Sequence, residues 1–247
     1  MTKEVKEKKG VIKELLEAGA HFGFIKSRRH PSVKPFILGA KNSIEIFDLE
    51  KTSVELEKAL NFMQEKGKEG AQGLFVGGKS EAREATTRAG EALNMPYVPG
   101  RWIGGTLTNF PEIKRRIARL EDLTEKREKG ELGKYTKKER LLFDREIAKL
   151  ETYFGGLSSM KNLPKFVVVI DPKKEHIAVS EAKKLKLPIL ALAGSDSNLY
   201  NIDYAIPAND ASRQAISYIL GVLVSAYKEG LSERKLKEES VVKKEDK

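Results

Sequence analysis

Short runs of β-branched and other apolar residues alternate along the chain with segments of helical periodicity. Six runs are predicted to be strands: 43–49, 73–78, 95–100, 166–171, 188–194 and 204–209. Several of these runs are apolar at nearly every position, which is typical of strands covered by helices on both faces. Helical patterns fall between the runs, at about 11–18, 54–66, 81–93, 175–185 and 211–228. The alternation predicts βαβ units and therefore an α/β fold, Rossmann-like or flavodoxin-like, with a doubly wound and mainly parallel sheet.

Between the third and fourth predicted strands, the segment 111–154 follows a different pattern. Two charge-rich helical stretches each carry a narrow apolar seam, formed by Ile113, Ile117 and Leu120 and by Phe143, Ile147, Leu150 and Phe154. Gly130 and Gly133 supply a turn, and Thr136 with Glu139 forms a capping box for the second stretch. We expect an inserted, helical coiled-coil hairpin, which protrudes because little apolar surface lies outside the seam.

These patterns divide the chain into three parts. The α/β body is expected to be discontinuous, comprising residues 1–110 and 155–228, with the hairpin insertion at 111–154. The last segment, 229–247, has mixed charge and few large apolar residues. Such a composition buries too little apolar surface to offset the entropy of ordering, so we expect a disordered, charged tail.

Composition narrows the class of partner. The chain has 247 residues, 40% of them hydrophobic, which is enough to bury a core. Its formal net charge of +10 favours a polyanion as partner, either nucleic acid or an anionic membrane surface. The absence of cysteine excludes disulfides and thiolate chemistry and suits the cytoplasm. The first residues lack the apolar core of a signal peptide, and no apolar run approaches the ~20 residues of a membrane span. A peripheral membrane role stays open, but no amphipathic segment beyond core-facing helices favours it, so no membrane partner is expected.

The stretch GLFVGGKS, residues 73–80, matches the pattern of a phosphate-binding loop. In a true loop of this kind, the variable residues follow the strand and wrap the phosphates. Here Leu74, Phe75 and Val76 are themselves the apolar strand, and the segment before them is polar. We therefore favour a structural role, in which two glycines make a strand-to-helix turn and Ser80 caps the next helix, and we expect no nucleotide cofactor.

No catalytic constellation emerges from the remaining polar residues. The three histidines, His21, His30 and His176, lie far apart, without metal-ligand or nucleophile–base spacing. His21 is expected where a short helix ends near residue 23, and His176 near the start of a helix. Acidic residues such as Asp196, Asp203 and Asp210 suit turns and helix starts.

The segment 22–43 is the strongest candidate for binding. Six cationic or ionisable residues occur in it without one Asp or Glu, and Phe22, Phe24 and Phe36 lie among them: Lys26, Arg28, Arg29, His30, Lys34 and Lys41. Lys and Arg neutralise phosphates, and prolines hold such a loop extended, so the segment suits an RNA backbone. A solvated basic loop is the alternative.

Two further basic sites, each of two residues, extend this candidate surface. Arg101 and Trp102, the only tryptophan, precede two glycines; the indole either stacks on a base or closes the end of the sheet. Lys114 and Arg115 lie on the first arm of the predicted hairpin, off the seam.

Long stretches of the chain closely resemble the bacterial small-subunit ribosomal protein S-two family, the second protein of that subunit. They include LLEAGAHFGFIKSRRHPSVKPFILGAKNSIEIFDLEKT, RWIGGTLTNF, GGLSSMKNLPKFVVVIDPKKEHIAVSEAKKLKLPILAL and YAIPAND, in order, between about residues 11 and 230. The resemblance implies a Rossmann-like body with a protruding hairpin, in a non-enzymatic protein of the cytoplasmic ribosome. It also implies binding of small-subunit ribosomal RNA between head and body, and help in docking the large messenger-binding ribosomal protein.

Carried over by position, the basic residues of 22–43, the Arg101–Trp102 turn and the basic hairpin arm would face RNA or neighbouring ribosomal proteins. Lys79 would face an RNA phosphate rather than a nucleotide. Some family members hold an ion at the carboxyl edge of the sheet, with acidic residues in the segments that match ALAGSDSN and YAIPAND. Gly194 stands where an Asp is common, although Asp196 and Asp210 remain, so no metal site is expected.

Two other classes of function compete with this one. A doubly wound enzyme that uses a nucleotide is supported by the fold and the 73–80 pattern, although a fold alone does not decide function. A scaffold protein that offers its hairpin to a partner is the third possibility, and the basic segment 22–43 counts against it.

Overall fold

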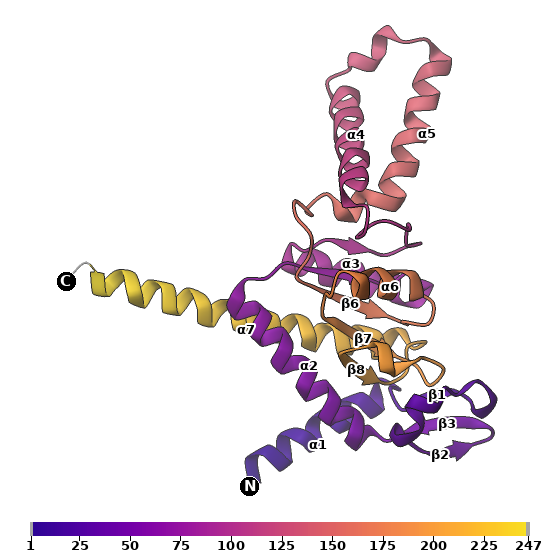
Figure 1. The fold of residues 1–247 in the computed structure, drawn as a ribbon, viewed down its shortest axis with the longest axis vertical. Helices are drawn as coiled ribbons and strands as arrows, with labels where there is room; N and C mark the ends of the chain where they lie inside the picture. Colours follow the sequence, from indigo (N-terminus) through magenta and orange to yellow (C-terminus); the bar gives the residue numbers. More distant parts are fainter. Residues whose placement is uncertain (1, 246–247) are drawn as a thin grey trace.

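The computed structural model describes the backbone of residues 2–245 and the side chains of residues 10–236. Five parallel strands form the main sheet: β4 (Gly73–Val76), β5 (Tyr97–Val98), β6 (Phe166–Ile170), β7 (Ile189–Ala193) and β8 (Tyr204–Pro207). Their order is β5-β4-β6-β7-β8 (Figure 1). This is the flavodoxin-like order, in which the chain reverses the direction of strand addition between β4 and β6. The predicted fold class is confirmed.

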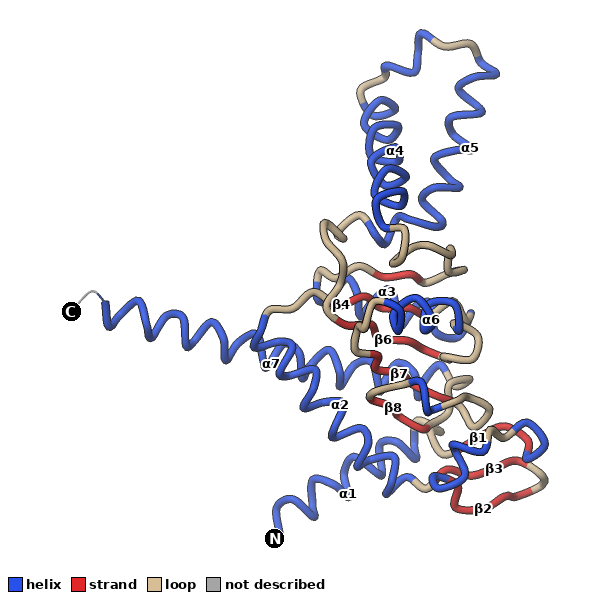
Figure 2. Tube along the Cα trace, in the orientation of Figure 1, coloured by secondary structure: helices blue, strands red, loops and turns tan. Residues whose placement is uncertain are grey.

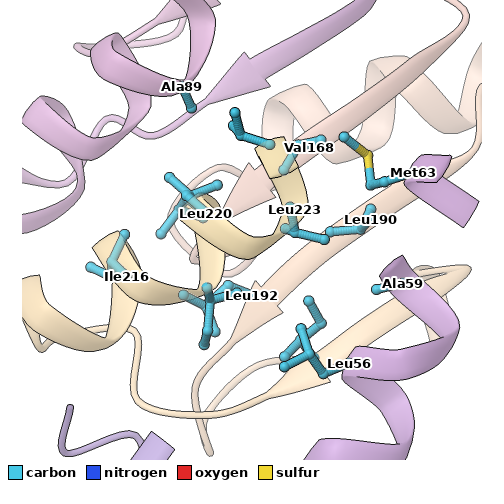
Figure 3. Close-up of a cluster of buried hydrophobic side chains, with 14 of the residues drawn as sticks. Leu56, Ala59, Met63, Ala89, Val168, Leu190, Leu192, Ile216, Leu220 and Leu223 are labelled. Carbon is cyan, nitrogen blue, oxygen red and sulfur yellow. The ribbon is translucent and has the colours of Figure 1, made fainter. Parts of the chain in front are cut away.

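One face of the main sheet is covered by the helices α2 (Leu49–Glu69), α3 (Ser80–Leu93) and α7 (Arg213–Glu245). Figure 3 shows Leu190 of β7 next to Met63 of α2 and Leu223 of α7, all of them buried in one cluster. Alternate residues of each strand point to this face because side chains of a strand have a period of two.

The opposite face of the sheet packs against α6 (His176–Lys184) and the base of the helix pair α4 (Phe110–Glu128) and α5 (Lys137–Phe154). Leu74, Val167 and Val169 belong to this second apolar cluster. Burial of both faces is the physical reason that the strand segments are apolar at nearly every position.

The first predicted strand, 43–49, does not join the main sheet. A separate antiparallel sheet of order β1-β3-β2 contains β1 (Phe22–Ile25), β2 (Ile37–Lys41) and β3 (Ile44–Phe47), as Figure 2 shows. Asn42 and Ser43 both have positive φ, as in the tight turns that join hairpin strands, so β2 and β3 pair locally. The predicted extended loop 22–43 is therefore two strands and two 3-10 helices, η1 (Lys26–Arg28) and η2 (Pro31–Phe36).

The helices α4 and α5 project from the sheet region, joined by η3 (Glu131–Lys134) (Figures 1 and 2). The predicted seam residues of both helices lie in one apolar cluster, with Phe143 packed at its margin. The capping box of Thr136 and Glu139 is confirmed, and Gly130 has the positive φ that the turn requires. Coiled-coil geometry for this pair remains a prediction.

Both ends of the described chain are helical. The first helix, α1 (Thr2–Glu17), precedes the small sheet, and α7 continues to Glu245. The helix thus runs through most of the segment for which the sequence predicts disorder; residues 246 and 247 lie outside the described residues. A formed helix propagates at little cost through Lys, Glu and Leu, and the segment beyond Gly230 contains neither proline nor another glycine.

Two short 3-10 helices, η4 (Gly155–Leu157) and η5 (Leu199–Asn201), complete the described elements. None of the helices in the described part of the chain combines the length and the apolar composition that crossing a bilayer requires.

Candidate nucleic-acid interface

Four of the predicted RNA-binding residues lie in the small sheet or in the 3-10 helices between its strands, with exposed side chains: Lys26, Arg28, Lys34 and Lys41. Lys26 and Arg28 belong to η1, Lys34 to η2, and Lys41 ends β2. Within residues 10–236, none of these four is found in an ion pair, whereas their neighbour Arg29 is. They therefore present unneutralised positive charge to solvent, as a phosphate-binding surface requires.

Arg29 and His30 hold the same segment in place. The guanidinium Nη1 of Arg29 lies 3.0 Å from Oε1 of Glu45, whose side chain is only 1% exposed. His30 Nδ1 lies 2.8 Å from the hydroxyl of Ser32, and the His30 backbone N–H donates to the carbonyl of Ser195 at 2.9 Å. Glu45 lies just beyond the acid-free segment 22–43, on β3, so the composition of that segment does not reveal the partner of Arg29.

Trp102 is a core side chain in this structure. It is 5% exposed, and its indole N–H donates to Oε1 of Glu181 at 3.2 Å. The carboxylate of Glu181 also accepts the backbone N–H groups of Gly105, Leu107 and Thr108 at 2.7–3.1 Å. Of the two predicted roles for Trp102, the geometry supports closing the end of the sheet; stacking on a base would require the ring to leave the core.

Glu181 holds this turn through its hydrogen bonds, and the sequence patterns did not reveal it. Burial raises the pKa of Glu181, but the backbone donors and the indole outweigh burial, so the net pKa is lowered. An available signal was a Glu on the apolar side of a helix, between Ala178 and Ala182. An ionised carboxylate here ties α6 to the segment that leads into α4.

The remaining predicted contacts lie at the hairpin end of the molecule. Arg101 is exposed in the loop after β5, and Lys114 and Arg115 are exposed on α4. Arg115 also approaches Glu112, at 3.4 Å, on the same helix. The small sheet lies at the other end of the long axis (Figure 1). The structure therefore separates the predicted RNA-binding residues into two basic regions rather than one patch.

Lys79 lies at the carboxyl edge of the main sheet, where the small sheet approaches it. Its Nζ is 3.2 Å from Oδ2 of Asp171, at the end of β6, and 3.4 Å from Oδ2 of Asp210, which follows β8. It also lies 5.6 Å from the ring centroid of Phe24 in β1. The predicted contact of Lys79 with RNA competes with these two ion pairs.

The glycines of GLFVGGKS serve close packing. A Cβ on Gly78 would lie 2.5 Å from the Gly100 carbonyl oxygen, and one on Gly77 would collide with Thr86. Ser80 is the first residue of α3 and its hydroxyl bonds to Glu81; the predicted cap by Ser80 is wrong, because Lys79 occupies the cap position without a side-chain bond. The turn thus has no phosphate-cradling loop after the strand.

The charged side chains at this edge shift one another's pKa values. Burial and the nearby Asp171 raise the pKa of Asp210 to about 7, and Lys79 only partly offsets them. Burial would lower the pKa of Lys79, but Asp210 and Asp171 outweigh burial and raise it. Burial also raises the pKa of the nearby Glu175.

The other polar candidates have structural partners. Asp196 pairs with Lys173 at 2.8 Å, and Asp203 accepts the Ile189 backbone N–H at 2.8 Å. His176 begins α6, as predicted, whereas the helix before His21 ends at Glu17 rather than near residue 23. Among the described side chains, no three His, Asp or Glu residues are grouped as metal ligands.

Fold and surface together define a basic, doubly wound α/β protein with an ion-paired lysine, Lys79, at the carboxyl edge of its sheet. The profile of the family described as "Ribosomal protein S2" matches residues 15–230. "Small ribosomal subunit protein uS2" of Chloroflexus aurantiacus is 42% identical over 228 residues, covering 92% of this chain and 96% of that protein. The proteins of that name from Salinibacter ruber and Geotalea uraniireducens are 40% and 42% identical, over 92% of this chain in each case and over 71% and 88% of theirs.

The chain belongs to the ribosomal protein S2 family. It is a structural, non-enzymatic component of the small ribosomal subunit and acts in translation. The competing interpretation as a nucleotide-using enzyme is thereby wrong.

Proposed function

We propose that this protein binds small-subunit ribosomal RNA through its two basic regions, at the junction of head and body, and helps dock the large messenger-binding ribosomal protein in the cytoplasmic ribosome. The observation that carries RNA binding is the set of exposed cations on the small sheet. Arg28, Lys34 and Lys41 stand free of carboxylate partners within residues 10–236, while Arg29 beside them is anchored by Glu45. The anchored arginine stiffens the segment, and its free neighbours are left for phosphates.

The separation of the basic regions supports contact with two RNA segments. One region is the small sheet and the other comprises Arg101, Lys114 and Arg115 near the base of the hairpin (Figure 1). The five-stranded parallel sheet lies between them. A protein of this shape suits a junction between two RNA domains better than a single helix.

For the protein partner we assign an apolar surface of the small sheet, formed by residues of β1 and β3. The cross-strand partners Ile25 and Ile44 are 46% and 41% exposed, and Phe22, paired with Ile46, is 49% exposed. Contiguous apolar side chains offer nothing to phosphates but gain free energy when a protein covers them. The adjoining cation Lys26, which the RNA-binding test leaves in place, favours a partner with acidic residues. We assign this face to the messenger-binding ribosomal protein.

RNA binding is tested by replacing three free cations together, as Arg28→Met, Lys34→Met and Lys41→Met. Filter binding to small-subunit ribosomal RNA is measured across a range of salt concentrations. Each lost phosphate contact makes the negative slope of log K against log salt shallower by about 0.7–0.9, so the slope of the triple variant should be shallower by about 2.1–2.7. A matched triple with the same charge loss, Lys58→Met, Arg88→Met and Lys184→Met, lies on exposed helical surface elsewhere. Equal slopes for the two triple variants would refute the assignment.

Protein docking is tested separately with Ile25→Ser and Ile44→Ser in one chain. Tagged small subunits are purified and probed for the messenger-binding protein and for ribosomal RNA. We expect less of the protein partner at unchanged RNA content. The control is Leu141→Ser with Leu142→Ser, an exposed apolar pair on α5. Full recovery of the partner with the Ile25/Ile44 variant would remove the docking assignment and leave RNA binding intact.

A further inference from the structure

The crevice at the reversal point of a doubly wound sheet is where such folds usually bind ligands. In this chain the crevice lies beyond the carboxyl ends of β4 and β6, which flank the reversal. Lys79 follows β4, and Asp171 follows β6 directly with a positive φ of 62°. Asp210 joins them from the segment after β8.

The two carboxylates in the crevice are buried, and they need a counter-charge. The side chains of Asp171 and Asp210 are 12% and 1% exposed. Asp171 uses Oδ1 to accept the backbone N–H of Lys174 at 3.1 Å, which leaves Oδ2 for Lys79. Within the described residues, neither carboxylate oxygen of Asp210 has a hydrogen-bond donor beyond the Lys79 ion pair at 3.4 Å. Removing water from such a pair without a cation is costly.

Lys79 is the lysine that pairs with both of these carboxylates, and it is largely shielded from solvent. Its side chain is 15% exposed, and Phe24 covers it from the small sheet at 5.6 Å. Gly194, at the end of β7, gives Asp210 room, because a Cβ there would lie 2.7 Å from Oδ1 of Asp210.

The residues of the crevice do not fit the ion that the family resemblance implies. Gly194 offers no ligand where an Asp is common, and Asp196 is already paired with Lys173 at 2.8 Å. The ammonium of Lys79 stands between the two remaining carboxylates, Asp171 and Asp210. A divalent ion prefers several oxygen ligands at 2.0–2.6 Å and would have to displace this ammonium against like-charge repulsion.

We propose that Lys79 is an internal cation, which occupies the space of a bound metal ion and ties the ends of β4 and β6 to the segment after β8. Its contact with Phe24 adds β1 to this connection. The small sheet is also held by the Phe24 backbone N–H, which donates to Ser195 Oγ at 2.9 Å. Lys79 therefore helps to hold the small sheet, and with it the basic segment 26–34, against the main sheet.

The test compares the full-length protein with Lys79→Met in thermal unfolding, with EDTA or with millimolar Mn²⁺ as the probe ion. Wild-type Tm should be the same in both conditions. The Lys79→Met variant should lose roughly 10 °C in EDTA, because two buried carboxylates are left without their cation. Mn²⁺ should then raise its Tm by several degrees, since the vacated crevice binds the ion in the folded state only.

Two further variants separate this role from ordinary surface charge. Lys174→Met removes an exposed lysine at the same edge, whose Nζ contacts the Gly78 carbonyl oxygen at 3.3 Å, and should change neither Tm nor the response to Mn²⁺. Lys79→Met combined with Asp210→Asn removes one positive and one negative charge; it should regain much of the lost Tm and respond less to Mn²⁺.

Three results would overturn the proposal. One is stoichiometric binding of Mn²⁺, Mg²⁺ or Zn²⁺ to the wild-type protein in titration calorimetry. Another is a Lys79→Met variant as stable as Lys174→Met, and the third is a destabilised Lys79→Met variant that Mn²⁺ does not stabilise. If Lys79→Met does not fold, the wild-type titration still decides, and Lys79→Arg, which keeps the charge, should fold and remain insensitive to Mn²⁺.

Discussion

The lysines of the small sheet and Lys79 are the same residue type in opposite circumstances. Lys34 and Lys41 are exposed and have no carboxylate partner within residues 10–236. Lys79 is largely buried, lies within 3.4 Å of two carboxylates and is covered by a phenylalanine. The first two are free for an external anion, and the third completes an internal charge balance.

This comparison shows that the role of a cationic side chain depends on whether a carboxylate of the same protein pairs with it, and not on the charge of its neighbours in the sequence. Arg28 and Arg29 are adjacent in sequence, yet only Arg29 pairs with a buried carboxylate, that of Glu45. A mutation that removes an internal cation should reduce stability first. One that removes an exposed cation should reduce RNA affinity and leave stability nearly unchanged.

The largest expected effect concerns Asp210 and pH. Its pKa is raised to about 7 in the folded protein, against ~3.9 in an unfolded chain, so the folded state holds a proton that the unfolded state releases. Stability due to this group is therefore present below about pH 4 and is lost as pH rises to about 7. Asp210→Asn should shrink the fall in unfolding free energy between pH 5 and pH 8 by about 2–4 kcal/mol.

Urea unfolding of both proteins at each pH measures this difference. Glu175, whose pKa is also raised by burial, is present in both proteins and cancels in the comparison. A parallel pH dependence in the two proteins would show that Asp210 is ionised throughout.

The next effect separates the neighbouring arginines. Arg29→Met leaves Glu45 buried without its partner and should cost about 2–3 kcal/mol, somewhat less than a fully buried pair because Arg29 is partly exposed. Arg28→Met should stay within about 0.5 kcal/mol of wild type. Equilibrium unfolding checks both values, and equal stabilities would mean that the Arg29–Glu45 pair does not form in solution.

A smaller effect follows from the glycine beside Asp210. Gly194→Ala places a Cβ 2.7 Å from Oδ1 of Asp210, so the carboxylate must shift relative to Lys79, at a cost of about 1–2 kcal/mol. Gly39→Ala is the control, because a Cβ there meets nothing within 4 Å. The expectation fails if both substitutions change the free energy of unfolding equally.

The smallest effect compares single lysines in RNA binding. Lys34→Met should make the negative slope of log K against log salt shallower by about 0.7–0.9, because one phosphate contact is lost. Lys79→Met also removes one positive charge but, if Lys79 is internal, should leave the slope unchanged when binding is measured well below the Tm of the variant. Filter binding across salt concentrations is the measurement, and a slope made shallower by Lys79→Met would place Lys79 at the RNA.

Much of the main fold could be predicted from the sequence. Five of the six predicted strands lie in the parallel sheet, because a strand buried on both faces must be apolar throughout. The seam of the helix pair and its capping box were also evident from spacing. The segment 43–49 was misplaced, since an apolar run does not reveal which sheet it joins; the turn at Asn42 and Ser43 decided that.

The candidate site was only partly predictable. Lys26, Arg28, Lys34 and Lys41, which the sequence predicts to face RNA, have exposed side chains, and their contact with RNA stays a prediction. The sequence did not reveal the partners of Arg29, Trp102 and Lys79, which are separated from them by 16, 79 and 92 positions along the chain. Such contacts depend on the packing of whole elements, and no local pattern encodes them.

The periodicities, the excess of positive charge and the family can be recognised without coordinates, because each is carried by residue types and their local spacing. Which cations are free and which are internal becomes apparent in the folded chain. Burial raises the cost of an unpaired charge, and whether a charge is paired depends on side chains brought together from distant strands. For Lys79 those side chains are Asp171 and Asp210, which the fold alone places at its ammonium group.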